Sequence, residues 1–140
     1  MSIHFFCINT TVTLNKRKKL KQFIEQLIKV EKRKLLSLSI IFCSDEYLLN
    51  INRQFLNHDY YTDIITFNLA ESLDVIEGEI YISINRITEN ALLMSVPKNQ
   101  ELHRVIFHGI LHLCGYNDTS ARQKKLMTSM EDIHLQNYFL

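Results

Sequence analysis

Two histidines and an aspartate in the last third of the sequence have the residue types and spacing of a metal site. His108 and His112 are four residues apart, so on a helix, which turns about 100° per residue, both side chains project from one face. Gly115 follows three residues later and is a natural left-handed helix stop, after which the chain can turn back. Asp118 can then bring a carboxylate toward the two imidazoles. Three protein ligands with a fourth position left open are typical of a catalytic zinc site.

The segment that carries the two histidines is apolar and fits a helix over residues 97–114. Burying an imidazole without a partner is costly, so histidines in this setting need a polar partner or a metal ion. Glu101 falls on the histidine face two turns earlier. It either assists the site or is a surface glutamate at the helix start, which is the simpler interpretation. The position after His108, which is the general-base glutamate in H-E-x-x-H peptidases, is Gly109, and this disfavours peptidase chemistry.

Several motifs resemble one known family. Residues 108–118 (HGILHLCGYND) resemble the H-G-x-L-H-L-x-G-Y-D-H signature of the bacterial YbeY-type endoribonucleases, the rRNA maturation factors. Residues 50–53 and 62–67 resemble that family's N-x-x-(F/Y)-R and T-D-V-L-S-F elements, and residues 78–83 are similar to its G-D-I-x-I-S strand. The motifs occur in the family's order, so the resemblance is more specific than any one of them.

The resemblance implies one Zn²⁺ ion on His108, His112 and Asp118. The family's third histidine falls on Asp118 here. A carboxylate is an acceptable zinc ligand, but its negative charge could favour another divalent transition metal. His134 is an alternative third ligand that we disfavour, because it lies on a separate helix.

Arg53 is the catalytic residue that the resemblance implies, because it occupies the position of the family's functionally important arginine. A guanidinium can donate hydrogen bonds to two phosphate oxygens at once. Without the resemblance, Arg53 would be interpreted as a surface arginine at a helix end. Asp63 either orients a ligand histidine or simply opens a strand. His103 and Arg104 are weaker candidates for RNA contact.

The composition predicts a single domain over residues 1–140. The chain has 140 residues, is 46% hydrophobic and contains only 3 Gly and 1 Pro. Cys7, Cys43 and Cys114 lie far apart and are expected to be buried thiols of a reducing compartment, with a ligand role for Cys114 as a minor alternative. No segment approaches the roughly 20 apolar residues of a membrane span, and no signal pattern opens the chain, so a cytoplasmic protein without a membrane partner is expected.

Positive charge is concentrated in one segment. Residues 16–34 hold nine basic and two acidic residues, an excess of seven positive charges, so the rest of a chain with net charge +1 carries six net negative charges. This asymmetry suits a phosphate-rich partner. The alternative is the solvated face of an amphipathic helix.

The order of periodic segments predicts an α+β domain: a small mixed sheet of about four strands with about five helices packed around it. Strands are expected over residues 2–7, 36–43, 63–69 and 77–84, and the last two should form an antiparallel hairpin. The first strand, helix and second strand suit a parallel crossover. Ser44 or Asp45 should cap the second helix, and Ser120 with Gln123 forms a capping box for the last. Core positions expected in that last helix are Leu126, Met130, Ile133 and Tyr138.

The resemblance and the site together predict a zinc-dependent, single-strand-specific endoribonuclease. Its substrate would be an rRNA precursor, in maturation of the 16S rRNA 3′ end and in ribosome quality control, and its partners the small ribosomal subunit or its proteins. Two alternatives stay open. One is a non-catalytic, metal-stabilised assembly factor that binds RNA, and the other is a metallohydrolase with a non-nucleic substrate. The oligomeric state does not follow from the sequence.

Overall fold

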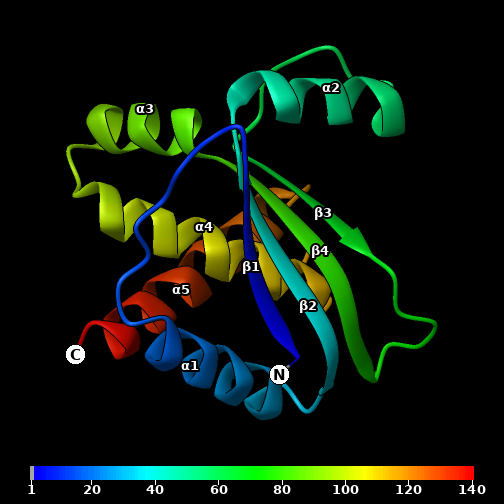
Figure 1. Ribbon diagram of the computed structural model, residues 1–140. Coiled ribbons are helices and arrows are strands. Elements are labelled where there is room, and N and C mark those ends of the chain that lie inside the picture. Colours follow the sequence, from blue (N-terminus) through cyan, green and yellow to red (C-terminus); the bar gives the residue numbers. More distant parts are fainter. Residues whose placement is uncertain (1) are drawn as a thin grey trace.

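A four-stranded mixed sheet forms the centre of the computed structural model, which describes residues 2–140 (Figure 1). The strands are β1 (Ile3–Ile8), β2 (Lys34–Cys43), β3 (Ile64–Asn68) and β4 (Val75–Ser83), in the order β1-β2-β4-β3. β1 and β4 run parallel to β2, whereas β3 pairs antiparallel with β4. The parallel pairing of the first two strands and the hairpin of the last two were both predicted, and they are confirmed.

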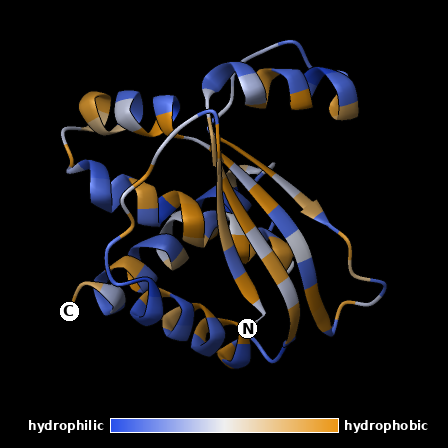
Figure 2. Ribbon diagram, in the orientation of Figure 1, coloured by the Kyte–Doolittle hydropathy of each residue, from blue (hydrophilic) through white to orange (hydrophobic). Residues whose placement is uncertain are grey.

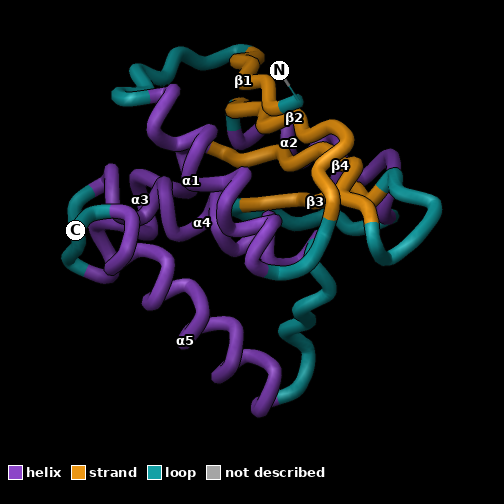
Figure 3. Tube along the Cα trace, turned by 90° about the horizontal axis from the view of Figure 1, so that it is seen from below, coloured by secondary structure: helices purple, strands orange, loops and turns teal. Residues whose placement is uncertain are grey.

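Five helices surround this sheet: α1 (Arg17–Val30), α2 (Asp45–Leu56), α3 (Ile84–Met94), α4 (Lys98–Leu113) and α5 (Ala121–Tyr138). α4 contacts β3 and β4, and both α3 and α5 pack on α4. Figure 3 shows α5 farthest from the sheet, with α4 between them. α2 packs on the opposite face of β3 and β4, where Ile65 and Tyr81 lie. The predicted α+β class, with four strands and five helices, is therefore confirmed.

The two faces of the sheet bury different amounts of apolar surface. The main core lies between the sheet and α1, α4 and α5, and its largest buried side chains include Phe42 and Phe107. A smaller cluster of Cys43, Leu48, Ile51 and Ile65 lies under α2. In Figure 2 the outward side of α1 is mainly hydrophilic, as its lysines predict. No helix within residues 2–140 is long and apolar enough to cross a membrane.

The predicted caps set the helix starts. The Ser44 hydroxyl accepts a hydrogen bond from the Tyr47 backbone N–H, at the start of α2. Ser120 and Gln123 form the expected capping box of α5, each side chain accepting from the other residue's backbone N–H. Capping therefore places α5 directly after the loop that contains Asp118.

Two glycines let α4 lie close against the sheet. A Cβ atom on Gly109 would stand 2.8 Å from Ile64 Cδ1, and one on Gly78 would stand 2.7 Å from the Phe67 carbonyl oxygen and 3.0 Å from Leu113 Cδ2. Such distances are below ordinary carbon contacts. Gly109, which lies between the two candidate ligand histidines, therefore has a structural role as well: it lets α4 approach β3 and β4 closely.

Three residues that were predicted to be buried are exposed. Leu126 and Ile133 of α5 are 51% and 48% exposed, whereas Tyr138 is buried and Met130 packs at the edge of the core. The buried face of α5 is instead Met127, Glu131, His134, Leu135 and Tyr138. Two polar residues occupy the buried stripe, so the apolar pattern points to the wrong face. Cys7 is exposed rather than buried, because it lies near the end of an edge strand.

Candidate metal centre

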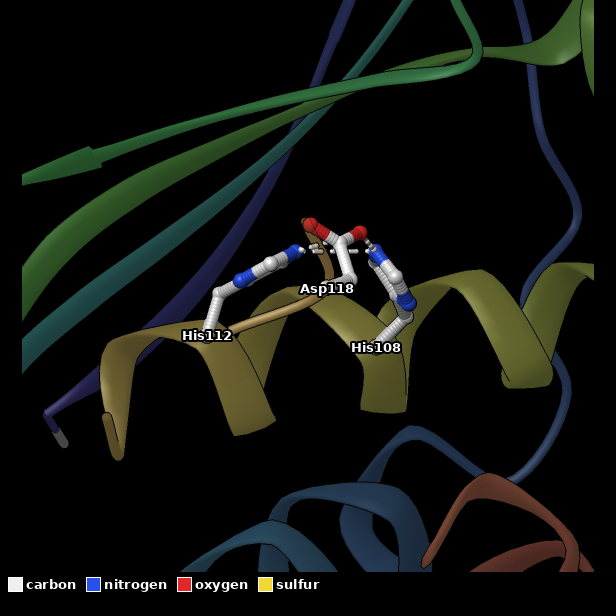
Figure 4. A group of neighbouring side chains, drawn as sticks. All are labelled: His108, His112 and Asp118. Atoms are coloured by element: carbon white, nitrogen blue, oxygen red, sulfur yellow. Dashed lines mark hydrogen bonds and ion pairs between the residues drawn. The ribbon is translucent and has the colours of Figure 1, made fainter. Parts of the chain in front are cut away.

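The C-terminal end of α4 is shaped so that Asp118 returns to the histidine face. Gly115 has φ 102°, in the left-handed region. Its N–H donates to the His112 carbonyl, and the Tyr116 N–H donates to the Leu111 carbonyl, both at 3.0 Å. This pair of bonds is the Schellman motif, which ends a helix and reverses the chain. Figure 4 shows the result: the Asp118 carboxylate lies between the two imidazoles.

One ligand atom from each of the three side chains converges on a common point. His108 Nε2 and His112 Nε2 are 3.0 Å apart, and Asp118 Oδ2 lies 3.4 Å from the first and 3.2 Å from the second. Atoms placed about 2.0–2.1 Å from a tetrahedral zinc ion are separated by roughly 3.3–3.4 Å. The spacing of this group therefore fits a small divalent cation, and these three residues could hold a metal ion.

The other ring nitrogen of each histidine faces a hydrogen-bond acceptor. His108 Nδ1 lies 2.6 Å from Glu131 Oε2, and His112 Nδ1 lies 2.8 Å from the Tyr116 carbonyl oxygen. An ionised carboxylate and a carbonyl can only accept, so these contacts favour the tautomer with the hydrogen on Nδ1 in both rings. That tautomer leaves an Nε2 lone pair of each ring free for a cation between the two atoms, which lie 3.0 Å apart.

Next to His108 lies a series of ion-paired side chains, two buried glutamates and the partly buried Arg104, that the sequence did not reveal. The Arg104 guanidinium donates to both carboxylate oxygens of Glu101, with Nε–Oε1 at 2.7 Å, and from Nη1 to Glu131 Oε1 at 2.9 Å. Glu101 and Glu131 are only 1% and 4% exposed. Glu101 is therefore not the surface glutamate that we expected, and Arg104 is an internal link rather than a free RNA contact.

The charges of Glu101, Arg104 and Glu131 compensate one another. Burial alone would raise the pKa of Glu131, but hydrogen bonds from His108 and Arg104 outweigh it and hold the pKa below its usual range. Hydrogen bonding to Glu101 is the main reason that the pKa of Arg104 is raised. Glu131 thus stays an anion in a nearly dry position.

Arg53 lies on a different element from the three candidate ligands. It is near the C-terminal end of α2 and pairs with Asp59, with side-chain exposures of 52% and 76%. The buried Asn52 amide donates to the Tyr60 carbonyl at 2.9 Å and so fastens the loop that carries Asp59. Among residues 2–140, no hydrogen bond or ion pair joins Arg53 to His108, His112 or Asp118.

The remaining candidates take structural positions. Asp63 accepts a hydrogen bond from Asn90 and lies 4.0 Å from Arg104 Nη2, and it does not hydrogen-bond either candidate ligand histidine. His103 is buried against Tyr138 and does not face solvent, so its suggested RNA contact is wrong. His134 packs against Phe23 and Phe107 and does not belong to the group of converging donor atoms, in line with our choice against it. Burial raises the pKa of the Cys114 thiol to about 12, which suits an inert side chain.

Comparisons with known proteins agree with these features. The family model described as Endoribonuclease YbeY matches residues 6–139. A Cytophaga hutchinsonii protein named Endoribonuclease YbeY is 48% identical over 134 residues, which is 96% of this chain and 94% of the relative. A Parabacteroides distasonis protein of the same name is 40% identical over 94% of this chain and 92% of its own length.

A solved structure supports the fold. The solution structure of a Thermotoga maritima protein is similar with a TM-score of 0.69 and 28% identity, covering 98% of this chain and 89% of that one. The family match, the relatives and the shared architecture lead to one conclusion: this chain belongs to the YbeY endoribonuclease family.

Proposed function

We propose that residues 1–140 act as one metal-dependent domain that cleaves single-stranded RNA during maturation of the 16S rRNA 3′ end and in ribosome quality control, in the cytoplasm. The observation that carries the metal dependence is the convergence of three donor atoms that lie within 4.8 Å of one another. Membership of an endoribonuclease family supports RNA as the substrate. Zn²⁺ is the ion we propose, because two imidazoles and one carboxylate with an open fourth side are a ligand set of catalytic zinc.

In this proposal His108, His112 and Asp118 would hold the ion. A divalent ion would supply a Lewis acid for the phosphodiester. The lysines exposed on α1 would attract RNA from solution, although two basic residues of this region also tie the fold together: Lys19 donates to the Tyr138 carbonyl and Arg33 to the Cys114 carbonyl.

Cleavage by metal-stripped and zinc-reloaded protein tests the proposal. A single-stranded RNA that spans the 16S 3′ end should be cut only after reloading, and elemental analysis should find one ion per chain. A duplex of the same sequence should be cut more slowly. Undiminished cleavage by protein shown to contain no metal would refute the catalytic role of the ion.

Arg53 is proposed as the catalytic residue that binds the substrate phosphate. Its exposure leaves the guanidinium available, and Asp59 is the partner it would exchange for phosphate. Replacing Arg53 with Glu should lower cleavage at least tenfold and leave the zinc content at one ion per chain. Arg53→Lys should recover only part of the loss, because an ammonium cannot grip two oxygens. Loss of zinc in Arg53→Glu would instead make Arg53 a structural residue.

A second candidate is a ribosome-assembly factor that binds RNA, in which the ion joins the Asp118 loop to α4. The direct approach of Asp118 to two residues of another element supports it. This version predicts salt-dependent RNA binding, no turnover, and unfolding when zinc is removed. The same stripped protein used for the cleavage assay separates the two, because circular dichroism shows whether it is still folded.

A further inference from the structure

Glu131 stands apart from the other acidic residues that the proposed function does not use. It comes from α5, 23 residues beyond His108, and is almost completely buried. Each of its oxygens has one donor: Arg104 Nη1 at 2.9 Å on Oε1 and His108 Nδ1 at 2.6 Å on Oε2. A buried carboxylate is costly, so it persists only where its partners are well placed.

We propose that Glu131 is the positioning residue of the metal centre: it holds the hydrogen of His108 on Nδ1, so that the Nε2 lone pair faces His112 and Asp118. An anionic acceptor at Nδ1 fixes the orientation of the ring and increases the electron density on Nε2. The inference rests on the proposed metal centre but not on RNA cleavage.

Arg104 and Glu101 hold Glu131 in turn. Arg104 is fixed by two hydrogen bonds to Glu101, donated from Nε and Nη2, and this orientation lets Nη1 donate to Glu131. Glu101 and Arg104 are three residues apart on α4, about two turns and one turn before His108. Helix α4 therefore supplies both Arg104, which binds the Glu131 carboxylate, and His108, whose ring this carboxylate orients.

The two candidate ligand histidines differ in the acceptor that faces Nδ1. His112 donates to a neutral backbone carbonyl belonging to the turn that follows its own helix. His108 donates to a charged side chain from another helix. Removing the Glu131 charge should therefore weaken metal binding through His108 and leave the hydrogen bond of His112 in place.

Glu131→Gln is the variant that tests this role, and Asp132→Asn is its matched control. Asp132 is the neighbouring carboxylate of α5 and is exposed. Glutamine replaces one of the two carboxylate oxygens by an NH2 donor group, so either Arg104 or His108 then faces a donor instead of an acceptor. We expect Glu131→Gln to lower Zn²⁺ affinity about 10- to 100-fold, the usual effect of such a change, and Asp132→Asn to leave it unchanged. Glu101→Gln should give a smaller loss in the same direction.

Two measurements separate positioning from a merely structural role. Chelator competition gives the Zn²⁺ affinity, and ¹H–¹⁵N correlation of metal-free protein shows which nitrogen of His108 carries the hydrogen, with signals assigned by their loss in His108→Ala. Wild type should have Nδ1–H, and Glu131→Gln should shift the population toward Nε2–H. The proposal is overturned if wild-type His108 carries its hydrogen on Nε2. This test uses the wild-type protein, so it does not depend on whether a Glu131 variant folds. It is also overturned if Glu131→Gln lowers only the melting temperature. Both measurements are made without RNA, so a failed cleavage assay leaves them valid.

Discussion

Helices α4 and α5 hold two pairs of histidines with opposite surroundings. His108 and His112 each have a hydrogen-bond acceptor at Nδ1 and turn Nε2 toward Asp118, and their side chains are 17% and 24% exposed. His103 and His134 are buried, and within residues 2–140 neither Nε2 atom has a hydrogen-bond partner. Their neighbours are aromatic rings.

The buried pair behaves as aromatic side chains. The His103 ring stacks on Tyr138 with centroids 4.9 Å apart, and the His134 ring meets Phe23 edge-on at 6.1 Å. A neutral imidazole in such a place contributes packing at the cost of one unpaired nitrogen. His103, like His112, has a backbone carbonyl at Nδ1. The comparison therefore teaches that the groups facing Nε2 decide whether a histidine is a candidate ligand or part of the core.

The largest effect expected from this comparison is on metal affinity. His112→Ala should lower Zn²⁺ affinity by more than about 100-fold, because even the loss of a residue that only orients a ligand costs about 10- to 100-fold. His134→Leu, which alters the buried pair instead, should keep the wild-type affinity. Chelator competition on both folded variants checks the difference. Equal losses in the two variants would contradict the division into two kinds of histidine.

Glycine substitutions should change stability and leave the ligands in place. Gly78→Ala places its Cβ 2.7 Å from the Phe67 backbone carbonyl oxygen, whereas the Cβ of Gly109→Ala meets side-chain methyl groups, Ile64 Cδ1 at 2.8 Å and Ile80 Cγ2 at 3.0 Å. Overpacking against backbone should cost about 2 kcal/mol in Gly78→Ala. In Gly109→Ala the gain in helix propensity, about 1 kcal/mol, offsets part of the strain. Urea unfolding of metal-free protein measures both. A Gly109→Ala protein less stable than Gly78→Ala would show that α4 cannot adjust on the sheet.

Local signals in the sequence were enough for the strands, the helices and the candidate ligand group. His108 and His112 share a face because of helical geometry alone, and the left-handed Gly115 is a local helix stop that returns Asp118. The caps at Ser44 and Ser120 depend on residues three positions away and were also predicted. Each of these features involves residues at most about ten positions apart.

Features that depend on helix packing did not follow from the sequence. Glu131 meets His108 across 23 residues, and only the placement of α5 on α4 creates this contact. Because Glu131 and His134 occupy the buried stripe of α5, the apolar residues Leu126 and Ile133 were assigned to the core in error. A signal was present: Glu101 and Arg104 share one helix face at a spacing suited to an ion pair. Their burial was not visible in the sequence.

The buried histidines should also give the fold a pH dependence of their own. Burial lowers the pKa of His103, despite the Asn99 carbonyl at 2.7 Å, and it lowers the pKa of His134, with Glu31 opposing the shift. A folded-state pKa below the unfolded value of about 6.5 means that the unfolded chain binds more protons, so the free energy of unfolding should fall as the pH drops below about 6.5. Each group can contribute at most about 2 kcal/mol between pH 6.5 and 5.

His134→Leu removes one of these groups without breaking a hydrogen bond among the described residues. Urea unfolding of metal-free protein at pH 7.5 and pH 5 should therefore show a smaller loss of stability on acidification in His134→Leu than in wild type. An equal loss in both would mean that His134 is protonated equally in the folded and unfolded chain, and the distinction between the two histidine pairs would then rest on metal binding alone.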